Sequence, residues 1–581
     1  MPTPTTSSPI AYSVLTGNQN VDSLMSGTQW AGSGGSTVTI SYSFPSGYAY
    51  FTTNYPDTSF WPTWLALSLT QQVETQNALA AWSHVANISF AQSPDNSTTV
   101  GDIRVTFSAG HPWGSIVGSA YYPSTNASGG DVWLDPYVKD VIGGLYSGNF
   151  GNATFQAGSY SYYTVLHELG HTLGLKHPFE SSPLNSIIAN PSLDGRVYTI
   201  MSYTTLADHT DAIGFTFNPT TPMLLDIAAM QALYGANMAH NAGDTVYYFN
   251  DNPGQHYFQT IWDGGGNNTI SYNGNTSSSI DLRQGYGSEI GNPVYAYTAT
   301  NSTAYIVNNL WIAYGTHIDT ATTTGTGNNT LTANNDGDTL IGGTGNDTFR
   351  GGSGNDTITG GGGADTAEFP NALSTYTISS TGVSDATRTT VLHQIDYLKF
   401  SDKTIYQGPA LTNANGSLTN AANIDGLHIA CTGEAAGNTI YSSNLNHTNG
   451  VALANQFIAQ AGLPNDATAL ATIFKNLGLA TVSGSSPVTD AANNQAGLYT
   501  TIAYLVKNDP GVIAAGGLAY ATNWLVNAVA SITTANPNYA AYSAAAAVLD
   551  TNIINAHNYS SQAANLSPEA ISTVSVGIVG V

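Results

Sequence analysis

A repeat of nine residues near the middle of the chain constrains its fold more than any other feature. The segments GGTGNDTFR, GGSGNDTIT and GGGGADTAE follow one another directly, and the weaker ANNDGDTLI precedes them. An aspartate and an apolar residue two positions later keep the same step, as Asp338, Asp347, Asp356 and Asp365 and as Leu340, Phe349, Ile358 and Ala367. A flexible glycine-rich linker does not keep acidic and aliphatic residues in phase over several units. The period therefore predicts a solenoid of stacked turns with an apolar interior and bound calcium.

The charge balance favours the same cation. The 581 residues include 36 Asp and Glu against 11 Lys and Arg, which gives a formal net charge of −25. This acidity argues against nucleic acid and anionic membranes as partners. Acidic side chains set among 61 glycines suit calcium, which binds carboxylate and carbonyl oxygens. A chain of this length is expected to form about two to four folded units.

Shifts in composition predict three domains. Residues 1–240 read as mixed α/β, with helical spacing of apolar residues at about 68–86 and 161–174. Residues 241–408 are rich in Gly, Asn, Asp and Thr, which favours turns and very short strands. Residues 409–581 are rich in Ala and Asn and carry helix start and stop signals, so we expect an all-α domain there.

The segment HELGHTLGLKHP indicates a metal site. It places His167 and His171 four residues apart on the predicted helix, so both imidazoles project from one face and can bind the same ion. Gly174 permits a sharp turn that returns His177 as a third nitrogen ligand, and Pro178 prevents the helix from continuing. Glu168 is poorly placed as a fourth ligand, but it can reach a metal-bound water.

Three protein ligands leave one coordination position open, which is typical of catalytic zinc. Zinc lowers the pKa of a bound water to about 7, so Glu168 is predicted to act as the general base and later to pass a proton to the leaving amine. The alternative is a helix that carries these histidines by chance. A chance match to the whole pattern has a frequency of roughly one in ten thousand or less, which favours the zinc site.

A second motif follows about 30 residues after this helix. The segment YTIMSYT supplies Met201 in a predicted tight turn and Tyr203 two residues later. With HELGHTLGLKHP and MLLDIAAMQALYGAN, it makes the chain resemble the serralysins, secreted bacterial metalloproteases of the metzincin group, over roughly residues 10–405. The resemblance implies a multidomain protein with an α/β metzincin catalytic domain and a parallel β-roll. It also implies that Met201 forms a hydrophobic floor under the zinc, and that Tyr203 is a displaceable zinc ligand that stabilises the oxyanion.

The resemblance also assigns calcium ligands. In the serralysin pattern the oxygens come from the second, fourth and sixth positions of each unit, which here are Gly343, Gly345, Asp347, Gly352, Gly354, Asp356, Gly361, Gly363 and Asp365. An earlier family site corresponds to Asp263, Gly265, Asn268, the carbonyl of His317, and Asp319. Asn268 and Asn329 stand where the family pattern has Asp, so we expect only three regular turns.

Other features concern location. The first residues lack the regions of a Sec-type signal peptide, no apolar run approaches the roughly 18 residues that span a bilayer, and the single Cys431 allows no intrachain disulfide. The resemblance implies secretion through type I machinery, with an uncleaved signal at the end of residues 409–581. That end, STVSVGIVGV, lacks the acidic residue common in such signals. A similarity to surface-layer-associated proteases of this group also allows attachment at the cell surface.

The sequence therefore predicts a secreted, extracellular zinc endopeptidase that acts on proteins or peptides by Glu-assisted attack of a zinc-bound water, with calcium-loaded repeats stabilising it. Two alternatives stay open. One is a calcium-dependent surface or adhesion protein that uses the peptidase unit as a scaffold, which the intact ligands and Glu168 disfavour. The other is a zinc hydrolase of the same superfamily with a different substrate.

Overall fold

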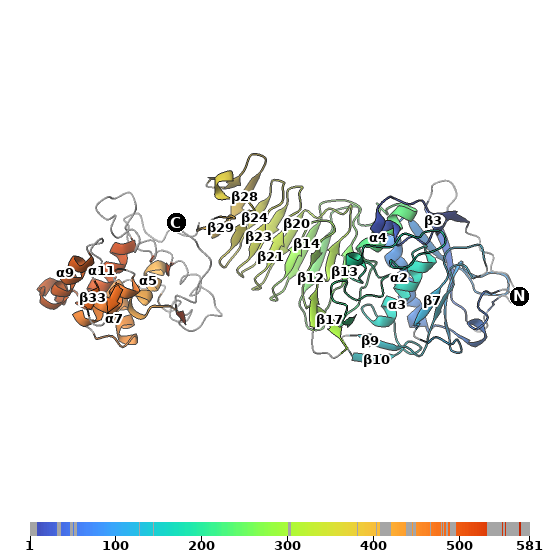
Figure 1. The fold of residues 1–581 in the computed structure, drawn as a ribbon, viewed down its shortest axis with the longest axis horizontal. Helices are drawn as coiled ribbons and strands as arrows, with labels where there is room; N and C mark the ends of the chain where they lie inside the picture. Colours follow the sequence, from blue (N-terminus) through green and yellow to red (C-terminus); the bar gives the residue numbers. More distant parts are fainter. Residues whose placement is uncertain are drawn as a thin grey trace. The chain divides into compact units, whose positions relative to one another are not determined.

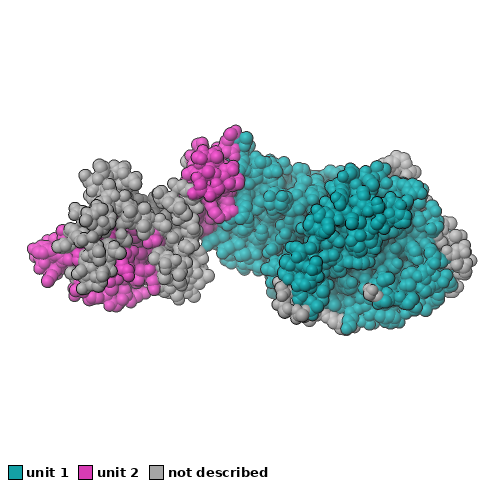
Figure 2. All heavy atoms as spheres, viewed as in Figure 1, with its two compact units in different colours: residues 1–359, 387–391 teal, residues 360–386, 392–581 magenta. Residues whose placement is uncertain are grey.

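The computed structural model describes residues 9–31, 37–46, 50–51, 55–114, 116–126, 128–142, 145–299, 304–379, 381–402, 404–406, 420–436, 444, 449–464, 466–477, 479, 481–483, 486–488, 495–530, 549, 552–553 and 569–570. The chain divides into two compact units, residues 1–359 with 387–391 and residues 360–386 with 392–581 (Figure 2). The first unit holds the α/β region together with the first repeats. None of the helices in the described ranges is long and apolar enough to cross a bilayer.

A mostly parallel sheet forms the frame of the first unit (Figure 1). Its strands run in the order β5 (Ile88–Gln92), β3 (Val38–Ser43), β6 (Ile103–Ser108), β8 (Val132–Leu134) and β7 (Gly118–Ala120). Pairing is parallel from β5 to β8, whereas β7 runs antiparallel to its neighbour β8, and the short strand β4 (Trp64–Leu65) pairs antiparallel with β6. All residues of β6 and β8 are buried, as expected for parallel strands covered on both faces. The strand β7 lies at the edge of the sheet, where its outer backbone groups can pair with another strand.

Three helices complete this region: α2 (Leu69–Val85), α3 (Tyr160–Thr172) and α4 (Leu224–Tyr234). The first two lie close to the ranges expected from the sequence. A capping box begins α2, and the Trp82 indole N–H donates to the Leu166 carbonyl at 3.2 Å, which ties α2 to α3. Nearly all of α3 is buried, so this helix runs through the hydrophobic core rather than along the surface.

The repeats of the first unit form two parallel sheets (Figure 1). One contains β12 (Val246–Asn250), β14 (Thr269–Asn273), β20 (Thr320–Thr323), β22 (Thr339–Ile341) and β24 (Thr357–Thr359); the other contains β15 (Ser279–Asp281), β21 (Thr330–Thr332) and β23 (Thr348–Arg350). Thr339 pairs with Thr357, and Thr330 pairs with Thr348. Consecutive units therefore fall in opposite sheets, and each pairs with the unit two repeats away. The central residue of each repeat strand is buried, which gives the expected apolar interior.

The second unit begins with the end of the repeats. Here β25 (Thr366–Glu368) pairs parallel with β29 (Tyr397–Lys399), which pairs antiparallel with β30 (Thr404–Tyr406). A separate hairpin joins β26 (Thr377–Ser379) to β27 (Gly382–Ser384). Parallel pairing thus ends in antiparallel strands at the close of the repeat region.

The helical part of the second unit has its own hydrophobic core. Its helices are α5 (Asn420–Thr432), α7 (Gly450–Gln460), α8 (Leu470–Asn476), α9 (Gln495–Asn508), α10 (Pro510–Ala514) and α11 (Leu518–Ala530). Short strand pairs accompany them: β31 (Glu434–Ala435) with β34 (Glu569–Ala570), and β32 (Thr481–Ser483) with β33 (Ser486–Val488). The all-α class therefore stays a prediction, and the expected signal STVSVGIVGV lies outside the described residues.

Candidate metal centre

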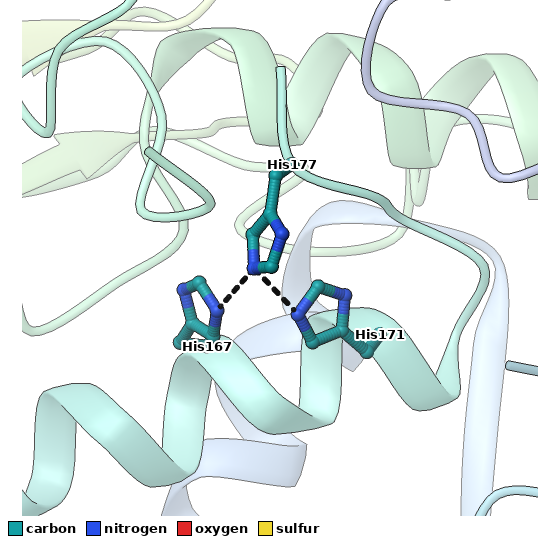
Figure 3. Close-up of side chains that lie close together, drawn as sticks. All are labelled: His167, His171 and His177. Atoms are coloured by element: carbon teal, nitrogen blue, oxygen red, sulfur yellow. Dashed lines mark hydrogen bonds between the residues drawn. The ribbon is translucent and has the colours of Figure 1, made fainter. Parts of the chain in front are cut away.

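Three imidazoles converge above helix α3 (Figure 3). The Nε2 atom of His177 lies 3.3 Å from Nε2 of His167 and 3.1 Å from Nε2 of His171. Tetrahedral zinc with bonds of about 2.0–2.1 Å to nitrogen separates its ligand atoms by about 3.3 Å, so these spacings fit one ion held by all three rings. Among the described residues, these three histidines are the one group of three or more His, Cys, Asp or Glu side chains that lie close enough to share a metal.

A tight turn brings the third histidine back over the helix. Gly174 has a φ of +103°, a left-handed conformation that glycine adopts without strain, and a Cβ there would meet the Thr28 carbonyl oxygen at 2.5 Å. The chain then passes Leu175, which forms an isolated antiparallel bridge with Met25. The turn therefore needs glycine for its conformation and for its close approach to a neighbouring segment.

The other nitrogen of each ring has an oxygen partner. Nδ1 of His167 lies 2.7 Å from the Ile200 carbonyl oxygen, and Nδ1 of His171 lies 2.7 Å from that of Leu175. Nδ1 of His177 lies 2.9 Å from a carboxylate oxygen of Glu180. The two carbonyl acceptors hold the ring protons of His167 and His171 on Nδ1, and the Glu180 charge beside Nδ1 of His177 favours a proton there, so the Nε2 lone pairs are left for a metal. Glu180 lies three residues after His177 in the sequence, but it was not identified from the sequence as part of the site.

Burial keeps the three rings uncharged. Desolvation, together with the neighbouring histidines, lowers the pKa of His167 well below its usual value and that of His171 to about 3. Desolvation also lowers the pKa of His177, although Glu180 opposes this shift. A neutral imidazole is the form that binds zinc, so the site needs no deprotonation near neutral pH.

Glu168 lies beside the triad and is only 4% exposed. Burial raises the pKa of its carboxyl group to about 8. A Cβ at position 118 would approach Glu168 Oε1 to 2.7 Å, so Gly118 lets the edge strand β7 run directly past this carboxylate. A buried carboxyl group with a raised pKa suits a group that both accepts and returns a proton near neutral pH.

Met201 packs against helix α3 at Gly170. It is fully buried, and a Cβ at Gly170 would lie 2.7 Å from its sulfur atom. Asp226 at the start of α4 holds the preceding turn, because its carboxylate accepts from Thr199 Oγ1 at 2.5 Å and from the Ile200 N–H at 2.8 Å. Burial raises the pKa of Asp226 to about 7, although these hydrogen bonds oppose the shift. Asp226 was not identified from the sequence.

Tyr203 stands at the open side of the site and is 59% exposed. Its ring centroid lies 4.4 Å from that of His177 and 6.0 Å from that of His167. Burial, together with the charges of Glu168 and Glu180, raises the pKa of Tyr203 to about 12. Its hydroxyl group therefore stays protonated near neutrality and can donate a hydrogen bond next to the metal position.

A buried lysine anchors the segment that carries the third histidine. Lys176 has no exposed surface, and its Nζ donates to the carbonyl groups of Ser23, Glu180 and Ile187 at 2.6, 2.5 and 2.8 Å. Burial lowers its pKa to about 8. Three carbonyl acceptors offset the cost of burying the ammonium group, so the loop around His177 is held to the N-terminal region. No local pattern in the sequence indicates this contact.

The carboxylates of the first unit's repeats cap turns in two successive layers. Asp356 accepts from the N–H of Gly352 at 2.8 Å in its own unit and from the N–H of Asp338 at 3.0 Å in the unit that pairs with it. Asp347 does the same with Gly343 at 2.9 Å and Asn329 at 2.7 Å. Asp338, Asp347 and Asp356 are all buried, and burial raises the pKa of each carboxyl group.

These layers fit a cation between them. Burial and neighbouring carboxylates, that of Asp356 first among them, raise the pKa of Asp338 to about 7. Its Oδ1 atom is buried and has no hydrogen-bond partner among the described residues. Cβ atoms at Gly345 and Gly354 would clash with backbone atoms of the adjacent layer, so glycine lets the layers approach. A buried carboxylate with an unpartnered oxygen, close to the charge of a second carboxylate, supplies oxygen donors of the kind that calcium prefers.

The third regular turn lies in the second unit. Gly361 and Gly363 have φ values of +106° and +113°, which are left-handed. Asp365 is buried, and its N–H donates to the Asp396 carboxylate at 2.9 Å. Asp396 was not identified from the sequence, because it lies beyond the last repeat.

Hydrogen bonds join residues of the earlier expected calcium site to one another. Asn268 donates from its side-chain amide to the His317 carbonyl at 2.9 Å and from its backbone N–H to Asp319 at 2.7 Å. Asp263 instead accepts from the Gly265 N–H at 2.9 Å and from the Tyr247 hydroxyl group at 2.7 Å. The amide of Asn268 therefore supplies donors to the oxygens expected to bind calcium.

Comparison with protein families gives two matches. Residues 65–193 match the matrixin family of peptidases, and residues 323–348 and 332–367 match the RTX calcium-binding nonapeptide repeat. The expected resemblance is confirmed, since the chain combines a matrixin peptidase domain with RTX repeats. The matches, the histidine triad and the buried aspartates support zinc and calcium as cofactors.

Two individual relatives are named as a serralysin and a metallopeptidase. The chain is 33% identical over 245 residues to "Serralysin" of Proteus mirabilis, which covers 38% of this chain and 48% of the relative. It is 32% identical over 288 residues to "Metallopeptidase AprA" of Pseudomonas marginalis, which covers 46% of this chain and 54% of the relative. The chain thus spans about half the length of the relatives it matches.

Proposed function

We propose that this chain, with its matrixin domain and RTX repeats, is a zinc-dependent endopeptidase of the serralysin type. The observation that carries the proposal is the convergence of three Nε2 atoms beside the buried carboxyl group of Glu168. His167, His171 and His177 would hold the zinc. When bound, zinc supplies Lewis acidity that polarises a carbonyl group and acidifies water.

The side chains around the triad take the other roles. Glu168 accepts the proton of the attacking water and passes it to the leaving amine, which its raised pKa permits. Tyr203 donates a hydrogen bond to the oxygen on which negative charge develops. The edge strand β7 runs past Glu168 and offers backbone hydrogen bonds to an extended peptide.

Casein hydrolysis by the purified, zinc-loaded chain tests this assignment. We expect Glu168→Ala to keep stoichiometric zinc and to lose activity by roughly 10²–10⁴-fold, the range for a positioned acid–base group. Glu74→Ala is the matched control, because Glu74 bonds Asn77 on the exposed surface of α2. A Glu168→Ala variant that digests casein at the parent rate would remove the assigned base. A peptide-inactive protein that hydrolyses another amide or ester would favour a different substrate class.

The repeats support proposals about location and organisation. We propose that calcium completes the turns of Asp347, Asp356 and Asp365 outside the cell, where millimolar calcium suits the roughly 10⁻⁴–10⁻³ M affinity of extracellular modules. Type I secretion, attachment to a surface layer, and domain boundaries at residues 240 and 408 remain proposals from the sequence. A calcium titration followed by circular dichroism tests whether calcium completes the turns of the repeats. Full β structure in a calcium chelator would contradict it.

A further inference from the structure

A pocket of about 310 Å³ beside the triad contains a charge that the proposed chemistry does not use. His167 and Glu168 line it on the side of the metal, and the stacked rings of Tyr160 and Tyr163 form an aromatic wall. The remaining charged side chain of its lining is Arg196. The pocket therefore joins the reacting centre to a fixed positive charge.

The guanidinium group of Arg196 is held in place without a carboxylate partner. Its Cζ lies 5.3 Å from the centroid of the Tyr163 ring. Nε and Nη2 donate to the carbonyl groups of Ser202 and Tyr203 at 3.4 and 3.2 Å. Within the described ranges, Arg196 forms no ion pair, and its Nη1 donates to no protein oxygen. An ordered guanidinium with donors to spare in a pocket is suited to bind a carboxylate.

We propose that Arg196 selects peptides with an acidic side chain directly after the scissile bond. This inference rests on the proposed peptidase function. Glu168 must pass a proton to the leaving amine, and Glu168 lines the same pocket as Arg196. The residue that carries this amine therefore directs its side chain into the pocket. A Glu or Asp carboxylate there accepts two hydrogen bonds from the guanidinium group, and Arg196 offsets its repulsion from Glu168.

A purely structural role for Arg196 makes a different prediction. If Arg196 only fixed the carbonyl groups of Ser202 and Tyr203, its loss would lower the cleavage of all peptides by the same factor. If it binds the substrate, its loss changes the ratio between acidic and neutral peptides. The ratio of kcat/KM values therefore separates selection from support of the turn.

The test uses the full chain loaded with zinc and calcium. Peptides that differ only in the residue after the scissile bond carry Glu, Gln, Leu or Lys, and mass spectrometry of the products fixes the cleaved bond. We expect the Glu peptide to exceed the Gln peptide in kcat/KM by about tenfold or more, as for a hydrogen bond between charged groups. Arg196→Met should bring this ratio close to one, and Arg196→Glu should favour the Lys peptide. Arg283→Met is the control, because Arg283 pairs with Asp281 in the repeats and should leave the ratio unchanged.

The outcomes distinguish the two proposals. Cleavage without a preference for acid, or a preference that survives Arg196→Met, overturns the role of Arg196 and leaves the peptidase intact. No cleavage of any peptide or of casein overturns the peptidase and the selectivity together. If zinc content or circular dichroism shows that Arg196→Met is misfolded, Arg196→Lys replaces it. That variant keeps the charge but loses the paired donors, so an intermediate ratio supports selection and an unchanged ratio contradicts it.

Discussion

The zinc centre and the repeats both gather polar groups around a cation, but over different distances in the sequence. His167 and His177, the outer two ligands, are 10 residues apart, and one helix with one turn brings them together. In the repeats, Asp356 bonds the backbone of Asp338, 18 residues earlier, across two stacked layers. A local motif can therefore form a site from the geometry of one helix, whereas the repeat sites exist only once the layers have stacked.

The two regions also differ in the charge that they bury. The histidines of the triad are neutral, because burial lowers their pKa values. The aspartates of the repeats are buried carboxyl groups with raised pKa values, and that of Asp338 is raised further by the charge of Asp356. Burying neutral rings costs little, whereas a buried carboxylate needs a cation or a proton to offset its charge. We therefore expect the zinc centre to keep its geometry without its metal, and the repeats to depend on theirs.

The largest expected effect separates the two regions. His171→Ala removes one ligand of three, so we expect zinc loss and a fall in peptidase activity of roughly 10³-fold or more, since zinc supplies several kcal/mol of transition-state stabilisation. The calcium dependence of the circular dichroism spectrum should not change. Metal analysis and peptide assays check the first part, and a calcium titration checks the second. Loss of the calcium response would show that the regions fold as one.

Phe349→Ala makes the reverse test. Phe349 is fully buried in the centre of β23, so its truncation should lower the free energy of unfolding of the calcium-loaded repeats by about 3–5 kcal/mol. Zinc affinity should stay the same. Chemical denaturation in calcium measures the loss, and Thr348→Ala, at a partly exposed neighbouring position, is the control with an expected loss below about 1 kcal/mol. Equal losses would contradict an apolar interior at position 349.

The pH dependence of Asp226 tests how the zinc side is supported. Burial raises its pKa from 3.8 to about 7, so the folded protein binds more protons than the unfolded chain between about pH 4 and 7. The free energy of unfolding contributed by Asp226 is therefore full below pH 4 and falls by a few kcal/mol as the pH rises to 7. Denaturation of the parent and of Asp226→Asn at several pH values measures this as a difference between the two proteins. A difference that is constant over this range would contradict the raised pKa.

The smallest expected effect concerns Glu180. Its carboxylate lies 2.9 Å from His177 Nδ1 at a partly exposed position, so Glu180→Gln should weaken zinc binding by about 10–100-fold without removing a ligand. Competition with a chelator of known affinity measures this change. Glu74→Gln, on the exposed surface of α2, should leave zinc affinity unaltered. An unchanged affinity in Glu180→Gln would show that the turn alone orients His177.

Helix positions and repeat period could be predicted because both depend on short-range geometry. The helix expected at about 161–174 is α3, Tyr160–Thr172, and its spacing of four aligns His167 with His171. The interior positions of the repeats followed from the nine-residue step that Phe349 and Ile358 keep. The pairing of units two repeats apart was not predicted, since a period of nine does not say whether successive units share a sheet.

The sequence by itself determined the metal-binding residue types, their spacing, the acidic repeats and the resemblance that these carry. Only the tertiary structure decided what surrounds them: the Glu180 carboxylate at His177, the carbonyl cage of Lys176, the tie of Asp226 to the turn of Met201, and Arg196 in the pocket. The physical reason is that helix and repeat geometry act between near neighbours in the chain. Burial, and the contacts that hold Lys176, Asp226 and Arg196, depend on which distant segments pack together, and no local pattern encodes that choice.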